Sequence, residues 1–589
     1  MSEDEPRSHA NAEVARLFAE LADILELQGE PVYRYSAYRT AARSIASATE
    51  SLDDLFKAGH LRQLRGVGQG LEARIVEYLT TGRMESYEQA RRDFPVALAS
   101  LMQVPGLGPT KARAVYHELG ISSAAELEQA ARDGRLRDVP GFGEKVAESV
   151  LANLERMKQR AGRGLLSDGW VAVHQVQEAL GSPAGAERIA VVGSVRRMQD
   201  TIGGVDLLAA RDDLEEAERL IDGVSRLPNL VDVRERASDS ISVRLYGGLD
   251  VRLFVVPRVA WGSALVWYTG SAAHVAHLTQ LASEQGWTLS AFGLEDELTG
   301  ARLAGESEVE VYERLGLAWV PPELREDEGE IEAALDGNLP RLIEQADLKG
   351  DLHCHTRETD GSNSLEEMAL AARARGYDYM ALTDHSRSLT ITNGLSLERL
   401  EEARRQVAQL NHRLAPFVIL LGTEMDILED GSLDYPDETL ASLDYVSASI
   451  HSRFKQAEPV MTARILRAIS NPLVHTLNHP HGRLLGIRPS YGVDMPRVVT
   501  TAATVGCAME VSADPARMDL DGGWARRVRE AGGRCTISSD AHSTLDFDNI
   551  WLAIGSARRG WLTTDDVLNT RPLDEFRALL RQRSQRIPR

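Results

Sequence analysis

Histidine and acidic residues follow a series of short apolar segments in the C-terminal part of this 589-residue chain. His353 and His355 stand two residues apart, so a strand would direct both imidazoles to the same side. Imidazole together with carboxylate suits Zn²⁺, Mn²⁺ or Fe better than Mg²⁺ or Ca²⁺. The sequence therefore predicts a divalent-metal centre. Its further members are Asp360, His385, Glu424, His451, His479, Asp540 and His542.

The chemistry that such a centre favours is phosphoester hydrolysis. Clustered divalent ions lower the pKa of water and stabilise the charge that develops on a phosphoryl group during transfer. Arg483 and Arg488 follow His479 in the segment HPHGRLLGIR, and we expect them to clamp a phosphate, with Arg483 as a catalytic candidate. The alternative is that both are ordinary surface arginines. Cys354 lies between the first two histidines, on the opposite strand face, and is expected in the core.

Most of these residues lie at or near the ends of short apolar segments. Seven such segments alternate with stretches of helical spacing, such as 364–375, 397–410 and 524–531. This alternation predicts a parallel α/β barrel whose site lies at the carboxyl ends of the strands. The segments are 351–356, 379–385, 417–426, 445–451, 474–480, 508–513 and 535–542.

The N-terminal quarter has helical apolar spacing and three short glycine turns, each before a helical stretch. Backbone N–H groups at such a turn, with the positive end of the helix dipole, bind phosphate without net positive charge. A single turn of this kind is usually only a tight connection, but three resemble helix-hairpin-helix elements. We therefore expect sequence-independent binding to the DNA backbone. The turn residues are Gly66, Gly68, Gly106, Gly108, Gly141 and Gly143.

The net charge of −22 argues against a broad basic surface for nucleic acid. Residues 1–163 are nearly neutral, with 22 Lys and Arg against 24 Asp and Glu, so contact with a polyanion is expected there. Three cysteines exclude a disulfide framework, and no apolar run is long enough for a membrane helix. The first ten residues are acidic and polar, unlike a signal peptide. We expect a cytoplasmic, nucleoid-associated protein without a membrane partner.

Strand-like segments in 189–256 resemble the palm of a nucleotidyltransferase. The segment Ile189–Ser194 ends in Gly-Ser and is followed by two arginines, and Tyr268–Ser271 reads Tyr-Thr-Gly-Ser. With the helical N-terminal region, these motifs resemble the bacterial family X DNA polymerases. The resemblance implies that an incoming triphosphate is bound by Gly193, Ser194, Arg197 and Gly270.

The palm departs from that family at its metal-binding carboxylates. The family holds two metal ions, expected here as Mg²⁺ or Mn²⁺, with an Asp-x-Asp pair and a third Asp on a neighbouring strand. Gly204 occupies the first position, while Asp206 and Asp250 remain as catalytic candidates. Asp200 is the one nearby carboxylate that could substitute. We expect polymerisation to be weak or lost.

Further departures concern the base pocket and lyase chemistry. The family's base-contacting Asn and a following Arg correspond to Val275 and Thr279. The lysine that forms a Schiff base in lyase-competent relatives corresponds to Arg74. Arginine stays protonated and is a poor nucleophile, so lyase activity is not expected.

The C-terminal segments resemble the PHP domain of polymerases and histidinol phosphatases, and all nine metal positions match. The resemblance implies three ions, held by His353, His355, Glu424 and Asp540, by Glu424, His451 and His479, and by Asp360, His385 and His542. The expected fold is multidomain, with a helical DNA-binding region, an α+β palm and thumb, and a distorted (β/α)7 PHP barrel. The expected boundaries are 1–80 (8-kDa-like), 81–163 (helix-hairpin-helix fingers), 164–257 (palm), 258–320 (thumb), 321–345 (linker) and 346–575 (PHP).

Three functions remain open from the sequence. The first is a DNA-repair protein, as in base excision repair, whose PHP site removes nucleotides from the 3′ end with Mn²⁺ while the palm holds a gap or primer end. The second is an active gap-filling polymerase that uses deoxynucleotide triphosphates and proofreads with its PHP site. The third is a DNA-binding scaffold whose PHP site hydrolyses a small phosphomonoester. Zn²⁺ remains an alternative to Mn²⁺ because the ligand types permit both.

Overall fold

The computed structural model describes residues 9–585 apart from 29, 31, 47–50, 65, 94–100, 102–106, 108, 122–123, 145, 149, 152–153, 155–162, 181–188, 228–229 and 246–247. The chain forms two compact units. The first comprises Met1–Ala161 and Arg226–Val231, and the second Gly162–Ser225 and Asp232–Arg589. Across the described ranges, every helix is too short or too polar to span a bilayer.

The first unit contains two helical cores. The apolar face of the first helix is buried, and Phe18 meets the Tyr38 ring edge-on at 5.3 Å in one core. The second core gathers residues such as Leu127 and Phe142. The helical character expected for this region is thus confirmed. Its described helices are α1 (His9–Gln28), α2 (Val32–Ala46), α3 (Leu52–Ala58), α4 (Gln69–Thr81), α5 (Glu85–Asp93), α7 (Pro109–Leu119) and α8 (Ala124–Arg132).

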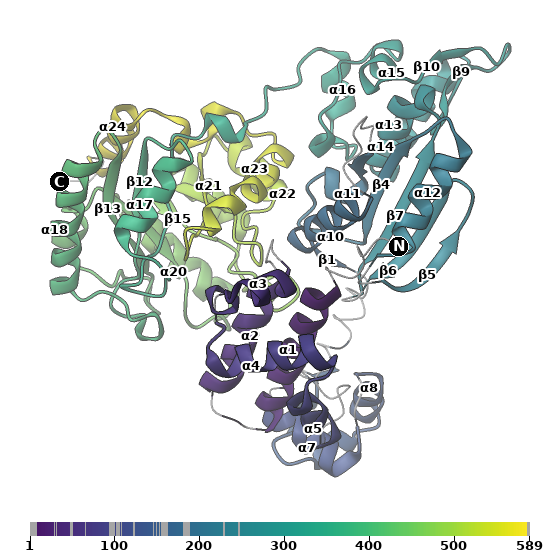
Figure 1. The fold of residues 1–589 in the computed structure, drawn as a ribbon. Helices are drawn as coiled ribbons and strands as arrows, with labels where there is room; N and C mark the ends of the chain where they lie inside the picture. Colours follow the sequence, from purple (N-terminus) through teal and green to yellow (C-terminus); the bar gives the residue numbers. More distant parts are fainter. Residues whose placement is uncertain are drawn as a thin grey trace. The chain divides into compact units, whose positions relative to one another are not determined.

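The second unit begins with the predicted α+β palm. Its five strands have the order β2-β4-β7-β6-β5, with β4 parallel to β7 and antiparallel to β2. Helix α12 packs on β6 and β7 (Figure 1). The elements are α10 (Leu166–Ala179), β2 (Ile189–Val192), α11 (Gly193–Arg196), β4 (Val205–Ala210), α12 (Leu214–Val224), β5 (Leu230–Arg236), β6 (Ser240–Leu245) and β7 (Asp250–Val256). Two further short strands, β1 (Gly164–Leu165) and β3 (Thr201–Ile202), pair antiparallel and form a separate two-stranded sheet.

The thumb follows the palm and has its own core around Val266, Leu278 and Tyr312. It combines helices with an antiparallel sheet of order β10-β9-β8. Its elements are α13 (Trp261–Thr269), α14 (Ala272–Glu284), β8 (Trp287–Ser290), β9 (Gly293–Asp296), β10 (Arg302–Ala304), α15 (Glu308–Arg314) and α16 (Glu330–Leu335).

A buried ion network joins the palm to the thumb. Arg196 of α11 donates to both carboxylate oxygens of Glu308, at 2.8 Å each. The fully buried Arg325 donates to the same carboxylate from Nη1 at 2.6 Å. Burial alone would raise the pKa of Glu308, but Arg325 and Arg196 outweigh it and lower the pKa to about 2.

We predict that Glu308→Gln lowers the free energy of unfolding by about 3–5 kcal/mol, because it leaves Arg325 buried without its counter-charge. Since folding lowers the pKa of Glu308, its stabilisation is present above the ordinary value of 4.5 and is lost as the pH falls towards 2. The unfolding free energies of both proteins in urea should therefore converge only below about pH 2. Glu313→Gln, at an exposed position on the same helix, is the control and should change stability little. A pH-independent difference between wild type and Glu308→Gln would contradict the electrostatic explanation.

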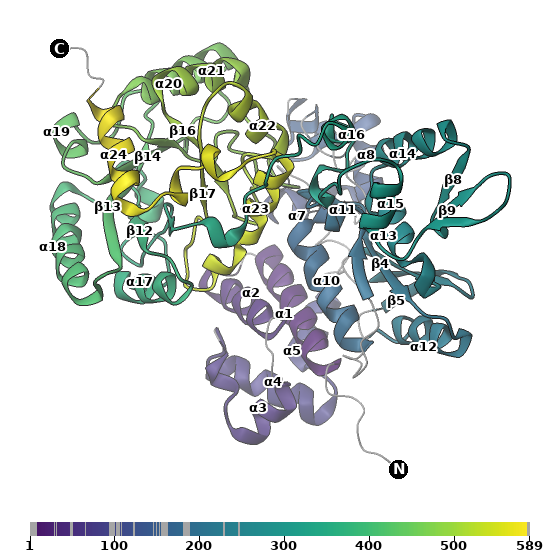
Figure 2. The same cartoon turned by 90° about the horizontal axis from the view of Figure 1, so that it is seen from above.

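The part of the chain predicted to be a PHP domain, called the PHP part below, is a seven-stranded barrel. Every neighbouring pair of its strands is parallel, in the order β11 to β17. Helices surround the strands (Figure 2). The strands are β11 (Gly350–Asp351), β12 (Tyr379–Leu382), β13 (Val418–Asp426), β14 (Tyr445–Ser449), β15 (Thr476–Leu477), β16 (Ala508–Ser512) and β17 (Cys535–Ser538). The main helices are α17 (Leu365–Ala374), α18 (Leu397–Leu414), α19 (Asp437–Leu440), α20 (Glu458–Ser470), α21 (Met495–Val505), α22 (Gly522–Glu530), α23 (Ile550–Arg559) and α24 (Leu573–Ser584).

The barrel is nearly closed between its first and last strands. Beyond β11 and β17, Cys354 and Ala541 form an isolated parallel bridge. The amide of His355 donates to the carbonyl of Ala541 at 2.8 Å, and the amide of Ala541 donates to the carbonyl of His353 at 3.1 Å. The distorted (β/α)7 barrel expected from the sequence is confirmed, and Cys354 is fully buried as predicted.

Candidate metal centre

The metal centre lies at the carboxyl ends of the barrel strands. Glu424 is within β13, and the other predicted ligands follow β11, β12, β14, β15 and β17. A parallel barrel brings these strand ends to one rim, so residues far apart in sequence meet there. His353 is fully buried, and Glu424 is only 1% exposed.

All nine predicted ligands come together. They form four overlapping groups, in each of which the ligand atoms lie within 4.8 Å of one another. The groups share His353, His355, His385 and Glu424, so they make one continuous cluster. The division into three ions implied by the family resemblance stays a prediction. The groups are His355, Asp360, His385 and His542; His353, His355 and Asp540; His353, Glu424 and His479; and His385, Glu424 and His451.

The hydrogen bonding of the cluster fits a metal ion. Both ring nitrogens of His355 and Nδ1 of His451 are buried, and none of them has a hydrogen-bond partner among the residues that the structure describes. An imidazole nitrogen in that state is costly unless a cation takes its lone pair. The donor set of imidazoles and carboxylates also matches divalent transition-metal ions. The arrangement of these residues is thus one that could hold divalent metal ions.

The pKa values of the clustered histidines reflect their close contact with carboxylates, as expected of a site for divalent ions. Burial would lower the pKa of His385, but the carboxylates of Glu424 and Asp360 outweigh it and raise the pKa to about 10. In the same way, Asp360 and Asp540 outweigh the effect of burial at His542 and raise its pKa to about 9. Burial and the neighbouring histidines lower the pKa of His355 to about 3. The carboxylates thus raise the proton affinity of some of these imidazoles, and a divalent ion would compete with the proton for the same nitrogens.

A second layer of carboxylates, which the sequence analysis did not single out, orients the ligands. Glu510 lies 2.7 Å from Nδ1 of His353 and accepts the amide of His479 at 2.8 Å. Burial raises the pKa of Glu510 to about 7. Asp351 accepts the amides of His353 and Ser539, which joins the first and last strands. Carboxylates behind metal-binding histidines fix the ring orientation. Alternation with apolar neighbours in the segment 508–513 was the available signal for Glu510.

The two predicted phosphate clamps are engaged with other protein groups. Arg483 donates from Nε to the carbonyl of Arg517 at 2.9 Å, from Nη2 to the carbonyl of Met518, and pairs from Nη1 with Asp200 at 2.9 Å. Arg488 donates to the carbonyl of Gly482 and stacks on Phe454, with its guanidinium 3.9 Å from the ring centre. Their predicted role stays a proposal.

The palm carboxylates are each paired with an arginine. Asp206 accepts from Arg252 at 2.7 and 3.0 Å, and Asp250 forms a similar two-point pair with Arg244. A Cβ atom at Gly204 would come within 2.8 Å of the carbonyl of Asp250, so a side chain there requires backbone movement. Asp200, the predicted substitute, pairs with Arg483 of the PHP part.

The predicted triphosphate ligands lie in or directly after α11 of the palm and directly after α13 of the thumb. Gly193 and Ser194 begin α11, and a Cβ on Gly193 would meet Asp206 Oδ2 at 2.7 Å. Arg197 donates to Glu326 at 2.8 Å and to the carbonyl of Thr269, beside Gly270, at 2.7 Å. Arg197 is therefore already ion-paired, and a nucleotide would have to compete with Glu326 for it.

The glycine turns of the first unit fit their predicted positions where they are described. Gly66 and Gly141 adopt φ values of +83° and +86°, which favour glycine. Gly68 precedes α4, and the carbonyl of Gly143 accepts the amide of Ala147. Their contacts with DNA stay a prediction. Gly106 and Gly108 lie outside the described residues.

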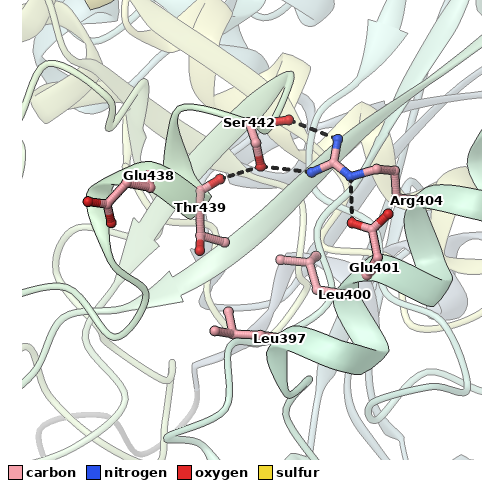
Figure 3. A pocket seen from close by; sticks show the side chains of 7 residues that line it. All are labelled: Leu397, Leu400, Glu401, Arg404, Glu438, Thr439 and Ser442. Atoms are coloured by element: carbon pink, nitrogen blue, oxygen red, sulfur yellow. Dashed lines mark hydrogen bonds and ion pairs between the residues drawn. The ribbon is translucent and has the colours of Figure 1, made fainter.

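A separate pocket of about 250 Å³ lies between α18 and α19 (Figure 3). Arg404 crosses it and bonds to Glu401 at 3.0 Å and to the Ser442 hydroxyl at 2.7 Å. None of the nine metal ligands lines it, so this pocket is distinct from the metal centre. Its lining residues are Leu397, Leu400, Glu401, Arg404, Glu438, Thr439 and Ser442.

Comparison with known families defines the class of the protein. Residues 9–84 match the helix-hairpin-helix domain, and 98–156 match the SAM-like helix-hairpin-helix tandem. Residues 264–326 match the DNA polymerase beta thumb, and 351–489 match the PHP domain. The fold and the site thus define a polymerase-type scaffold joined to a PHP metal-dependent phosphoesterase domain.

Comparison with whole proteins defines the family. The chain is 35% identical over 575 residues to the "DNA polymerase/3'-5' exonuclease PolX" of Bacillus subtilis strain 168, covering 97% of this chain and 99% of that protein. It is 27% identical over 252 residues to a "Probable phosphatase" of Thermoanaerobacter sp. strain X514, covering 40% of this chain and 96% of that protein. A "Probable phosphatase" of Acetivibrio thermocellus is 26% identical over 261 residues, covering 41% of this chain and 98% of that protein. The chain belongs to the bacterial family X DNA polymerases that carry a PHP domain.

Proposed function

We propose that this protein is a DNA-repair enzyme that removes nucleotides from the 3′ end of DNA at its PHP centre. The observation that carries the proposal is the assembly of all nine ligands into one buried cluster. The relative from Bacillus subtilis carries the exonuclease activity in its name and aligns over nearly the whole chain. Gapped or primer-template DNA in the cytoplasmic nucleoid is the substrate that we propose.

The proposed reaction is hydrolysis of the terminal phosphodiester. A water oxygen forms a bond to phosphorus while the bond from phosphorus to the 3′-oxygen of the preceding nucleotide breaks. The products are a nucleoside 5′-monophosphate and a shortened strand. The released 3′-oxygen of that strand takes up the proton that the water loses and becomes the new 3′-hydroxyl. Bound divalent ions, for which we propose Mn²⁺ with Zn²⁺ as the alternative, would supply Lewis acidity at the water and the phosphate.

Carboxylates of the chain hold the candidate metal-binding imidazoles in place for this reaction. Glu510 fixes the ring of His353 and the backbone of His479, so both imidazoles are held before substrate arrives. Glu424 lies within 2.9 Å of His479 Nε2 and within 3.2 Å of His451 Nε2. Preorganised ligands of this kind avoid the cost of reorganising the site during the reaction.

We propose that nucleotide incorporation by the palm is weak or lost. Gly204 supplies no carboxylate, and Asp206 and Asp250 are both paired with arginines. The palm and the helix-hairpin-helix elements would then serve to bind DNA. Two alternatives follow from the relatives. An active gap-filling polymerase with PHP proofreading is supported by the name of the Bacillus subtilis protein, and small-phosphomonoester hydrolysis by the phosphatases.

The experiment that tests the proposal incubates the purified protein with a 5′-labelled primer on a gapped template, Mn²⁺ and all four deoxynucleotides. We expect a ladder of shortened primers and no extension. Extended primers would support the gap-filling polymerase instead. Turnover of p-nitrophenyl phosphate without any change in the primer would support the small-phosphate enzyme.

We predict that Gly204→Asp alone leaves nucleotide incorporation at background. The added side chain meets the backbone of Asp250, and Arg244 and Arg252 still occupy the remaining carboxylates. Primer extension on a gapped template with the nuclease inactivated by His353→Ala measures this directly. Extension by Gly204→Asp/His353→Ala but not by His353→Ala would mean that the missing carboxylate is the sole defect.

A further inference from the structure

One strand of the barrel contributes no ligand to the metal cluster. Each of the other six strands carries or precedes members of the nine, whereas β16 is followed by the loop 513–521. This loop places Arg517 at the cluster. The guanidinium Nε lies 3.1 Å from Asp514 and 3.7 Å from Asp540, a predicted metal ligand.

Arg517 differs from the two arginines that the sequence analysis selected. Its Nε is bonded to Asp514, but within the described part of the chain neither of its Nη atoms has a hydrogen-bond partner. The side chain is 21% exposed, and among the described residues neither Nη atom is a buried donor without a partner. Arg483 and Arg488 instead direct most of their donors to backbone carbonyls.

The loop holds Arg517 in place before any substrate binds. Asp514 accepts the amide of Ala516 at 2.8 Å, and its carbonyl accepts the amide of Arg517 at 2.9 Å. The Nε of Arg483 donates to the Arg517 carbonyl at 2.9 Å, which fixes the loop from the other side. A guanidinium held by Nε at one edge presents its two Nη groups as a fork, the geometry that matches two phosphate oxygens.

We propose that Arg517 binds the substrate phosphate at the metal centre through Nη1 and Nη2, beside Asp540. The proposal deepens the exonuclease function and rests on it for the identity of the substrate, a DNA phosphodiester. A free phosphate or a phosphomonoester would engage the same two donors. Arg483 is then a positioning residue, which supports the loop that carries Arg517.

Inorganic phosphate and a 5′-labelled single-stranded oligonucleotide are the two probes for Arg517→Gln, used with the full Mn²⁺-loaded chain. We expect the inhibition constant of phosphate to rise about 10- to 100-fold, and kcat/KM for the oligonucleotide to fall by a similar factor. Arg517→Lys keeps the charge without the fork and should recover part of both losses. Mn²⁺ affinity, followed by titration, should stay within about twofold.

The matched control is Arg404→Gln, which removes an arginine that also pairs with an acidic residue three positions earlier, at the pocket of Figure 3. Phosphate inhibition and kcat/KM should be unchanged in this variant. If Arg517→Gln does not fold, the phosphate inhibition constant of Arg517→Lys tests the proposal instead. A constant above that of the wild type would support the proposal, and an unchanged constant would overturn it.

Wild-type phosphate inhibition in Arg517→Gln would overturn the proposal. So would a loss of Mn²⁺ binding in proportion to the loss of activity, since Arg517 would then only support Asp540. Phosphate binding to the metal-loaded protein can be measured by calorimetry without turnover. A chain that binds phosphate through Arg517 but does not degrade DNA would therefore contradict the exonuclease function while supporting the phosphate site.

Discussion

Glu424→Gln is expected to lower the rate of 3′–5′ DNA degradation at least about 1,000-fold, equivalent to about 4 kcal/mol of transition-state stabilisation. The Glu424 carboxylate belongs to two of the four ligand groups. It lies 2.9 Å from both His479 Nε2 and His385 Nδ1. Glutamine has nearly the same shape but lacks the charge that divalent ions require of this ligand.

The measurement is single-turnover degradation of a 5′-labelled oligonucleotide, together with the metal content of the purified variant. Glu402→Gln is the control, because Glu402 is exposed on α18 and paired with Arg405 outside the barrel. We expect Glu402→Gln to retain full activity and metal. Nuclease activity that survives in Glu424→Gln with unchanged metal content would place the chemistry outside this cluster.

Removal of the metal by a chelator is expected to abolish nuclease activity and to destabilise the PHP barrel. At a free metal concentration 100 times the dissociation constant, one site contributes about 2.7 kcal/mol to folding. Without metal, His355 and His451 keep buried nitrogens that have no hydrogen-bond partner within the described ranges of the chain. Calorimetric unfolding with Mn²⁺ and with chelator measures the shift, and re-addition of Mn²⁺ should reverse it.

The variant Glu424→Gln serves as the comparison for chelation. Because it has already lost a shared ligand, chelator should shift its unfolding temperature much less than that of the wild type. An equal shift in both proteins would mean that the chelator acts on the protein elsewhere. Activity that persists in chelator would contradict a metal-dependent nuclease.

The barrel and the clustering of the nine candidate ligands could be predicted from the sequence because both depend on local patterns. Short apolar segments that end in His or Asp recur through the PHP part, and parallel strands bring such ends to one rim. The pair His353 and His355 carried the strongest signal, since alternate residues of a strand share a face. Observed helices also agree closely with the predicted ones, although α18 extends to Leu414 rather than 410.

Residues that act through tertiary neighbours could not be predicted in the same way. Glu510 is one carboxylate in an apolar strand, and only the fold places it 2.7 Å from His353. Arg517 has no spacing that relates it to Asp540, because a whole helix separates their segments. The pairing of Asp206 with Arg252 depends on the parallel register of β4 and β7, which sets these two residues opposite each other.

The narrow join between the first and last strands of the barrel has a consequence for chain topology. The sheet itself runs from β11 to β17 without pairing those two strands, and the bridge at Cys354 and Ala541 is isolated. An ion bound by His353 and Asp540 would tie together segments from opposite ends of the domain, as a disulfide does. Loop-closure entropy makes such a cross-link more effective the longer the chain that it encloses. Metal loading would thus strengthen the narrow join that closes the seven-stranded barrel, and amide exchange at Ala541 should slow more than exchange in the central strands.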